Sequence, residues 1–299
     1  MSMLDKQSEL DESVRQRLRD LKKAQRRLFQ NPLSVVGLIL ILIVILTAVF
    51  APQLAPYPED SGDTLHFDQT GQPPSLEHPM GTDAVGRDVL SRVMFGARIS
   101  LLMGLTVVSI AIAIGVPLGL LAGYLGGWVN TVVMRVTDIF LAIPPILLAL
   151  AITAVLAANL WNAMIAIAFG WWTWYARLVQ GEVLSVKEEE FVEASESLGA
   201  GWFRVAFREI LPNIVAPLTV KATLDMGAVI LVGAALSFLG LGAQPPTPTW
   251  GAMISIGRDH VTSQWWMATF PGLAISFTVL GFNLLGDGLR DMFDVEVDE

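Results

Sequence analysis

The chain lacks cysteine altogether, and this absence excludes several kinds of chemistry at once. No disulfide bond, thiol nucleophile or thiolate metal ligand can form within it. Histidine is nearly as scarce, because His66, His78 and His260 are scattered along 299 residues and form no cluster of ligands. The sequence therefore predicts no metal site and no catalytic thiol.

Motifs that hold nucleotides or support hydrolysis are also missing. The sequence contains no G-x-x-x-x-G-K-[S/T] phosphate loop, no H-E-x-x-H and no G-x-S-x-G with a partnered histidine. We therefore expect neither a cofactor nor enzymatic activity on this chain, so any nucleotide hydrolysis must occur on another chain. A membrane-embedded enzyme with a scattered site stays open as an alternative, and Asp138 and Asp225 are its candidate acids.

Charged residues are few and strongly segregated. They make up 16% of the chain, against about 25% in soluble domains, while 53% of the residues are hydrophobic and the mean hydropathy is +0.57. Long runs contain no Asp, Glu, Lys or Arg, namely 28–58, 99–134, 139–176, 226–257 and 261–286. A helix needs about 20 apolar residues to cross a bilayer, and these runs lack the alternation of barrel strands. The fold class expected is an all-α integral membrane protein.

Six transmembrane helices account for the hydrophobic runs. We place them at about 33–50, 99–124, 131–156, 161–179, 216–239 and 265–285, with outer loops at 51–95 and 242–264. The first span follows a cluster of basic residues, comprising Arg15, Arg17, Arg19, Lys22, Lys23, Arg26 and Arg27. Basic residues favour the cytoplasmic side, so this segment is predicted to be a retained signal anchor. With six spans, both termini are expected in the cytoplasm.

A polar island at 182–213 interrupts the hydrophobic spans. Ser185 and Glu188 have the spacing of a capping box at a helix start, and Phe191, Ala194 and Leu198 fall on one face of the helix that would follow. Gly199 and Gly201 can end that helix in a left-handed conformation. A second helix at 202–211 would place Phe203, Phe207 and Ile210 on one face, before Pro212. The pattern predicts a helix-turn-helix against the membrane, either as a docking surface or as a connector without a partner.

The spacing within this island resembles the EAA loop of permease subunits of ABC importers. The matching positions are Glu193, Ala194, Ser195, Gly199, Leu211 and Pro212. In that family the loop is where the ATPase subunit docks, so the resemblance implies that these residues couple the chain to an ATPase. Glu209 departs from the pattern, because this position is usually apolar.

Four further segments extend the resemblance over nearly the whole chain. G-T-D-A-V-G-R-D-V-L-S-R at 81–92, continued by G-A-R-I-S-L-L at 96–102, precedes the second span, and its Asp83, Arg87, Asp88 and Arg92 could form a charge network. The other segments are the Pro- and Gly-rich elbow at 237–251, F-P-G-L-A-I at 270–275 and N-L-L-G-D-G-L-R at 283–290. Together they are similar to the C-subunit permeases of the dipeptide/oligopeptide (peptide/nickel) family of ABC importers.

The resemblance implies a type I ABC importer permease fold, in which one additional span precedes a five-helix core. It divides the chain into a cytoplasmic basic segment (1–30), a first span with its outer loop (31–95), a transmembrane domain with the coupling loop at 182–213 (96–293) and an acidic tail (294–299). It also implies a homologous permease as heterodimer partner, two ATPase subunits that bind ATP and Mg, an extracytoplasmic solute-binding protein and a peptide substrate. The expected surroundings are the lipid of the cell membrane, and nucleic acid is not an expected partner. The alternatives are a permease for nickel chelates or glutathione and, from another class, a membrane enzyme or an ATP-independent channel.

Two pairs of ionisable residues lie near or inside the spans. Arg135 and Asp138 are three residues apart, and Lys221 and Asp225 are four apart, so each pair could form within one helix. Such residues are either part of a polar pathway or gate, or a self-neutralised structural pair. Pro144 and Pro145 are expected to kink the helix that carries the first pair.

Overall fold

The computed structural model describes residues 29–294, and within this range the chain is helical, without a β-strand. The predicted basic segment, up to residue 28, and the tail beyond Asp294 lie outside the described residues. The longer helices are α2 (Pro32–Val49), α4 (Val89–Leu125), α5 (Gly127–Leu141), α6 (Pro145–Val155), α7 (Leu160–Val186), α11 (Val215–Phe238) and α13 (Trp266–Asp294). The shorter ones are α3 (Ala51–Leu54), α8 (Glu190–Ser197), α9 (Trp202–Arg204), the π-helix η3 (Val205–Ile210), α10 (Leu211–Asn213) and α12 (Trp250–Gly257), together with three short 3-10 turns.

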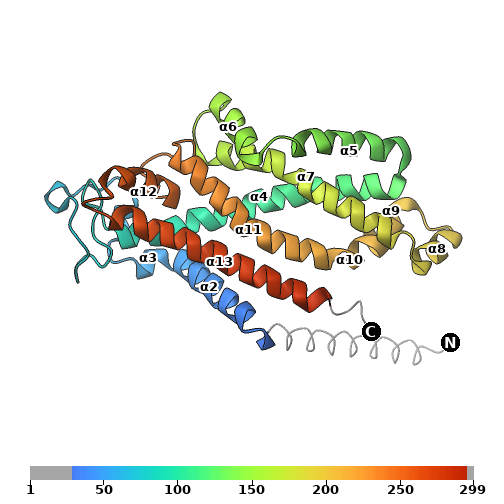
Figure 1. The fold of residues 1–299 in the computed structure, drawn as a ribbon, viewed down its shortest axis with the longest axis horizontal. Coiled ribbons are helices and arrows are strands. Elements are labelled where there is room, and N and C mark those ends of the chain that lie inside the picture. Colours follow the sequence, from blue (N-terminus) through green and yellow to red (C-terminus); the bar gives the residue numbers. More distant parts are fainter. Residues whose placement is uncertain (1–28, 295–299) are drawn as a thin grey trace.

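The helices form an elongated bundle that matches the predicted spans in order (Figure 1), while α4 begins ten residues earlier and α7 and α13 end later than predicted. Among the described helices, α2, α4, α11 and α13 are long and apolar enough to cross a membrane, and the α5–α6 pair counts as a fifth span if it is taken together. The predicted fourth span corresponds to α7, which has 27 residues but a more polar composition. The span predicted at 131–156, with a kink at Pro144 and Pro145, is two helices bent by 85° around residues 142–144.

A stripe of glycines on α4 brings its backbone against α7. Gly115, Gly119 and Gly123 recur every four residues and therefore lie on one helical face. A Cβ on Gly119 would lie 2.6 Å from the carbonyl oxygen of Ala176, and one on Gly123 would lie 2.7 Å from the Cβ of Val183. Small residues of this kind allow close helix packing inside a membrane. The close contact between α4 and α7 is therefore central to the core.

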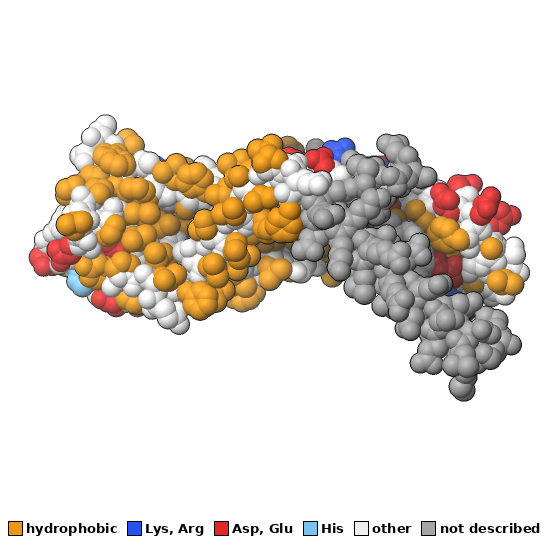
Figure 2. Space-filling model, turned by 90° about the horizontal axis from the view of Figure 1, so that it is seen from below, with side chains coloured by type: hydrophobic (Ala, Val, Ile, Leu, Met, Phe, Trp, Pro, Cys, Tyr) orange, Lys and Arg blue, Asp and Glu red, His pale blue; other side chains and the backbone are white. Residues whose placement is uncertain are grey.

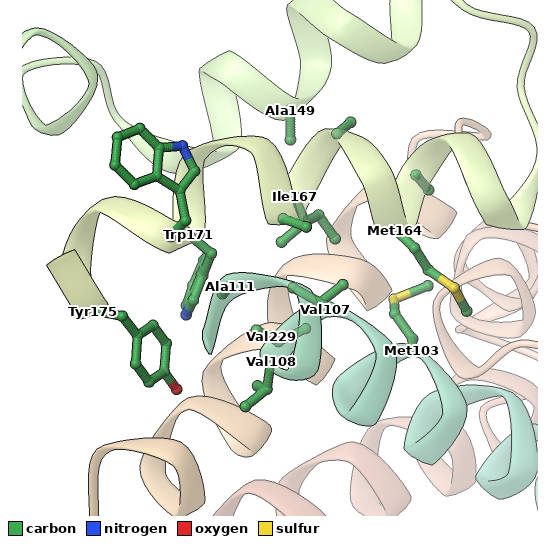
Figure 3. Packing of buried hydrophobic residues seen from close by; sticks show 14 of the residues in the cluster. Met103, Val107, Val108, Ala111, Ala149, Met164, Ile167, Trp171, Tyr175 and Val229 are labelled. Carbon is green, nitrogen blue, oxygen red and sulfur yellow. The ribbon is translucent and has the colours of Figure 1, made fainter. Parts of the chain in front are cut away.

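The main hydrophobic core lies where α4, α6, α7 and α11 meet. Met103 and Val107 from α4 pack with Met164 and Ile167 from α7, and Val229 of α11 joins them (Figure 3). These side chains are at most 3% exposed. Their van der Waals contacts fix the relative positions of the four helices.

The additional first span packs beside α13 on the other side of the bundle. A Cβ on Gly37 of α2 would lie 2.7 Å from the backbone nitrogen of Leu285, so the two helices approach closely here. Figure 2 shows a nearly continuous hydrophobic surface over the part of this side that is not covered by undescribed residues. Exposed apolar side chains on it include Leu42 and Ile39 of α2 and Phe277 and Leu280 of α13. This surface has the composition expected of a face in contact with lipid.

The loop at 51–88 folds over one end of the bundle around a buried polar network, not as a solvated loop. The Asp88 carboxylate caps α4 by accepting from the Ser91 backbone N–H at 2.7 Å, and it lies 3.0 Å from His78 Nδ1. Asp83 Oδ2 lies 2.9 Å from Arg87 Nε and 3.7 Å from Arg92 Nε. The predicted charge network is therefore present and largely buried.

The Pro- and Gly-rich elbow closes the same end of the bundle. Trp250, which begins α12, is 2% exposed and donates from Nε1 to the carbonyl oxygen of Val93 at 2.9 Å. Trp266 donates similarly to Thr82 O at 3.0 Å. These two indoles connect the segments after α11 and before α13 to the beginning of α4, so the predicted loop at 242–264 is a packed part of the fold that includes α12.

Candidate coupling surface

The polar island forms the end of the bundle opposite the 51–88 loop (Figure 1). Its first helix begins later than the capping-box pattern predicts. Helix α7 continues to Val186, so Ser185 lies in its last turn, and α8 begins at Glu190 after Glu189, whose side chain makes no capping hydrogen bond. The predicted capping box is thus wrong, because the span itself extends beyond the hydrophobic run.

Gly199 ends α8 in the left-handed conformation that the sequence predicts, with φ of +85°. Its N–H donates to Glu196 O at 2.9 Å, and the N–H of Ala200 donates to Ser195 O at 3.1 Å. This pair of bonds is the Schellman motif of a helix C-terminus. Gly201 has φ of −72° and instead precedes α9. The turn between the two helices of the island therefore depends on Gly199 alone.

The two sides of α8 have different environments. Val192 is 1% exposed and packs in a core with Val179 and Val183 of α7 and Val205 of η3. Phe191 is 43% and Leu198 89% exposed, so the helical face predicted from their spacing with Ala194 points away from the protein. Exposed hydrophobic side chains at a membrane protein's polar end indicate contact with another surface.

The second half of the island is helical from Trp202 to Asn213, but its middle is the π-helix η3. Ile210 is fully buried, whereas Phe203 is 61% exposed and stacks on Phe207 with ring centroids 4.6 Å apart. The predicted grouping holds for Phe207, which contacts Phe203 and packs against the cluster that contains Ile210, but Phe203 itself is exposed. The wider π turn changes the angular spacing of residues, and sequence periodicity of an α-helix does not anticipate it.

Side-chain hydrogen bonds hold the two halves together and attach them to the spans. Ser195 Oγ donates to Glu209 Oε1 at 2.8 Å, and Arg204 Nε lies 3.8 Å from the same oxygen. Tyr124, at the end of α4, donates from its hydroxyl to Glu196 Oε1 at 2.7 Å. Lys187 donates from Nζ to Tyr124 O at 3.0 Å. The island is therefore connected to α4 and α7 by polar contacts as well as by its core.

The six residues suggested by the resemblance are distributed over both halves of the island, on α8, at the Gly199 turn and on α10. Glu193, Ala194, Gly199 and Pro212 are exposed, whereas Ser195 and Leu211 are half-buried and contact the rest of the island. Sequence reasoning missed Tyr124 and Lys187, because nothing in their local pattern indicates a contact with α8 or with α4. It noticed Glu209 only as a departure, and the structure shows this carboxylate bonded inside the island.

Of the two ionisable pairs suggested by the sequence, one forms in the structure and the other does not. Lys221 Nζ lies 2.7 Å from Asp225 Oδ1, as the four-residue spacing predicts, and it also lies over the rings of Trp174 and Tyr175. Asp138 does not pair with Arg135. Its carboxylate forms an ion pair with Arg177 of α7, which is 39 residues further along the chain. No group of three or more His, Asp or Glu side chains that could hold a metal ion occurs within residues 29–294.

Comparison with known proteins agrees with this architecture. Residues 115–298 match the model of the family described as "Binding-protein-dependent transport system inner membrane component", and residues 21–74 match "N-terminal TM domain of oligopeptide transport permease C". The chain is 50% identical to the dipeptide transport system permease protein DppC of Escherichia coli K12, over 90% of this chain and 91% of that protein. It is 47% identical to DppC of Alkalihalophilus pseudofirmus, over 91% and 89%.

The chain is also similar to a glutathione permease and to a solved structure of a methionine transporter. The chain is 45% identical to the glutathione transport system permease protein GsiD of Shigella flexneri, over 91% of this chain and 89% of that protein. An inward-facing structure of the MetNI methionine ABC transporter has the same fold, with a TM-score of 0.56 at 20% identity over 68% of this chain and 97% of that chain. Together with the membrane-spanning helices and the exposed island, these matches show that the chain belongs to the family of inner-membrane components of binding-protein-dependent ABC transport systems.

Proposed function

We propose that this chain is the permease subunit of an ATP-driven importer of dipeptides or short oligopeptides. The substrate class is supported by the similarity to the dipeptide permeases at 47–50% identity over about nine tenths of the chain. Permeases of this family work with ATPase and solute-binding subunits. The proposal specifies a homologous permease as heterodimer partner, two ATPase subunits on the cytoplasmic side and a binding protein outside.

The observation that carries the coupling role is the exposed tip of the island. Phe191, Leu198, Trp202 and Phe203 present hydrophobic side chains around the Gly199 turn, while Val192 and Val205 anchor its inner side. Such a projecting, internally braced element can fit a cleft on a partner and move with it as one body. Glu193, Ala194 and Gly199 would contact the ATPase, and Ser195, Leu211 and Pro212 would maintain the shape of the element.

This arrangement gives a direct route for alternating access. ATP and Mg bind to the partner ATPases, whose closure displaces the island, and the island is connected to α7 through Val192 and to α4 through Glu196 and Tyr124. Only contacts that differ in free energy between the two states can shift the equilibrium between them. The island would supply such contacts if it fits the ATPase cleft differently in the open and closed states.

The orientation follows from the same proposal. With the island in the cytoplasm, the buried lobe of residues 51–88 and the α12 elbow face the binding protein outside. Helix α2 begins and α13 ends toward the island's end of the bundle, and Asn31 Nδ2 donates to Asp291 Oδ2 at 3.2 Å (Figure 1). These positions support a proposed orientation in which both ends of the chain lie on the cytoplasmic side, as the basic residues that precede α2 also favour.

The test is purification of the chain in mild detergent from its native host, followed by reconstitution of what copurifies. We expect a homologous permease and ATPases in stoichiometric amounts, and ATP-dependent uptake of a labelled dipeptide into proteoliposomes once the binding protein is added. Uptake that is inhibited by glutathione but not by dipeptides would reassign the substrate. A chain recovered alone, whose association with ATPases is unaffected by changes in 193–212, would contradict the coupling role.

A further inference from the structure

Asp138 and Arg177 form an ion pair on the outside of this chain, at a depth where the surroundings should be hydrocarbon. Their side chains are 50% and 42% exposed. Asp138 lies eleven residues after the start of α5 and Arg177 nine residues before the end of α7, so both lie roughly 14–16 Å from the island's end of these helices. Both residues lie within the predicted spans at 131–156 and 161–179, Asp138 well inside its span and Arg177 near the end of its span.

Charged side chains at such a depth almost always face a protein interior or a water-filled cavity. Other charged groups lie nearby in the sequence and in space. Arg135 is exposed one turn before Asp138 on α5, and Lys221 lies over the ring of Trp174, which is one turn before Arg177 on α7. The face therefore carries charges of both signs beside an exposed aromatic ring.

The break between α5 and α6 gives a second, independent indication. The two helices are bent by 85°, and Ala142, Ile143 and Pro144 at the break are exposed. Backbone that leaves the helix at membrane depth is tolerated only where protein covers it or where it lines a water-filled cavity. The break follows Asp138 by four residues, so both features lie on the same part of the chain.

The opposite side of the bundle has the apolar composition expected of a lipid-facing surface. Figure 2 shows that this side is largely apolar, and Leu42 of α2 and Leu280 of α13 are among the exposed apolar residues of these helices. Leu42 lies ten residues after the start of α2, inside that span. The charges and the helix break thus distinguish the α5–α7 side of the bundle from the α2–α13 side.

We infer that the α5–α7 face, defined by Asp138, residues 142–144, Trp174 and Arg177, lines the translocation path, and that the Asp138–Arg177 pair contacts the charged groups of the solute. A peptide carries an ammonium and a carboxylate group, which match the carboxylate of Asp138 and the guanidinium of Arg177. Arg binds carboxylates through two parallel hydrogen bonds. The second permease would supply the other wall of the path. The identity of the solute in this inference depends on the proposed function, whereas the position of the face does not.

The absence of cysteine makes the position of this face directly testable. Single cysteines at Ala142 and Trp174, with Leu42→Cys as the control on the apolar α2–α13 side, would be exposed to a charged, membrane-impermeant thiosulfonate on both sides of proteoliposomes that contain the whole importer. Only a thiolate reacts, and a thiol in lipid stays protonated. We expect labelling of Ala142→Cys and Trp174→Cys at least about tenfold faster than of Leu42→Cys. Equal rates at all three positions would overturn the inference, whatever the transported solute is.

The role of the ion pair needs a variant that separates solute contact from structure. Asp138→Asn and Arg177→Gln should each reduce dipeptide uptake at low concentration by about tenfold, because each removes a charge-assisted hydrogen bond to the solute. The double variant Asp138→Arg/Arg177→Asp restores an ion pair within the chain but inverts its direction. We expect its uptake to stay low while its thermal stability returns to that of the original protein. Recovery of uptake in the double variant would show that the pair is structural and would contradict the proposed contact.

If the solute is not a peptide, these outcomes remain distinguishable. Failure of dipeptide uptake in the unmodified importer would contradict the proposed substrate class. The labelling rates are measured with ATP and without a solute, so they would still decide whether the α5–α7 face lines the path.

Discussion

Ser195 on α8 donates a hydrogen bond to Glu209 on the π-helix η3, with 2.8 Å between the hydroxyl and carboxylate oxygens. This bond joins the two halves of the island on either side of the Gly199 turn. Glu209 is therefore used within the chain, although the family resemblance gives this position as usually apolar. The hydrogen bond between Ser195 and Glu209 thus holds the two halves of the island together, as an apolar side chain at position 209 would do by packing.

Removal of this hydrogen bond should loosen the coupling element without unfolding the spans. We expect Ser195→Ala to weaken the contact between α8 and η3 by about 1 kcal/mol and to lower the number of peptides transported for each ATP hydrolysed. The measurement is the ratio of uptake to ATPase activity in proteoliposomes. Arg204→Ala is the control, because this side chain is 68% exposed and lies 3.8 Å from Glu209, so its ion pair should contribute little. An unchanged ratio in Ser195→Ala would show that this hydrogen bond has no part in coupling.

Gly199 offers a test of the turn itself. A Cβ at this position would meet no heavy atom within 4 Å, so the constraint is the backbone φ of +85° and not space within the chain. We expect Gly199→Trp to leave the protein inserted but to uncouple ATPase activity from uptake, since a bulky residue would strain the turn by about 1–3 kcal/mol and project toward the partner.

Gly199→Asn is the matched variant, because Asn adopts the left-handed conformation more readily than other residues with a Cβ. It should retain most of the uptake. Normal uptake with Gly199→Trp, measured at equal amounts of protein in the membrane, would contradict the coupling role of this turn.

The ionisable pairs illustrate which contacts could be predicted from the sequence. Lys221 and Asp225 pair as expected because both belong to one helix, and the helical repeat alone brings them together. The spacing of Asp138 and Arg135 would also allow a pair within one helix, but Asp138 pairs with Arg177 of α7 instead. The packing of α7 depends on glycines of α4 and on the bend after α5, and no local pattern reports it.

The island shows the same limit in another form. The sequence pattern predicts two helices and the glycine that separates them, because these are local properties of the backbone. Helical spacing also groups Phe191 with Leu198, but it does not say whether their face is buried. In the structure Val192 fills the inner side and this group is exposed. Likewise, Pro144 and Pro145 predict a kink, whereas the 85° angle depends on how α6 packs on α7.

The buried carboxylate of Asp88 should be essential for the stability of the outer lobe. It is fully buried, it accepts from both the backbone N–H and the hydroxyl of Ser91, and it lies 3.0 Å from His78 Nδ1. We expect Asp88→Ala to lower the free energy of unfolding by about 3 kcal/mol, because it removes the helix cap and leaves buried donors without an acceptor. Thermal unfolding of the purified protein in detergent measures this effect.

Asp68→Ala is the control for Asp88, since Asp68 is exposed on the same loop. Its unfolding temperature should match that of the unmodified protein. If both variants unfold at the same temperature as the original protein, the network around Asp88 does not stabilise the lobe.

The close contact of α4 with α7 should make Gly119 intolerant of even one methyl group. A Cβ there would lie 2.6 Å from Ala176 O and 2.7 Å from the Cβ of Val179. In an unconstrained helix, Gly→Ala is favourable by roughly 0.5–1 kcal/mol, whereas overpacking costs about 1–3 kcal/mol. The backbone of α7 cannot move without disturbing its core, so the cost of overpacking should exceed the gain from replacing glycine.

We therefore expect Gly119→Ala to lower the unfolding temperature in detergent. Gly181→Ala on α7, where a Cβ meets nothing within 4 Å, should raise it slightly. The same sign of change in both variants would mean that the glycine stripe does not set the distance between the two helices.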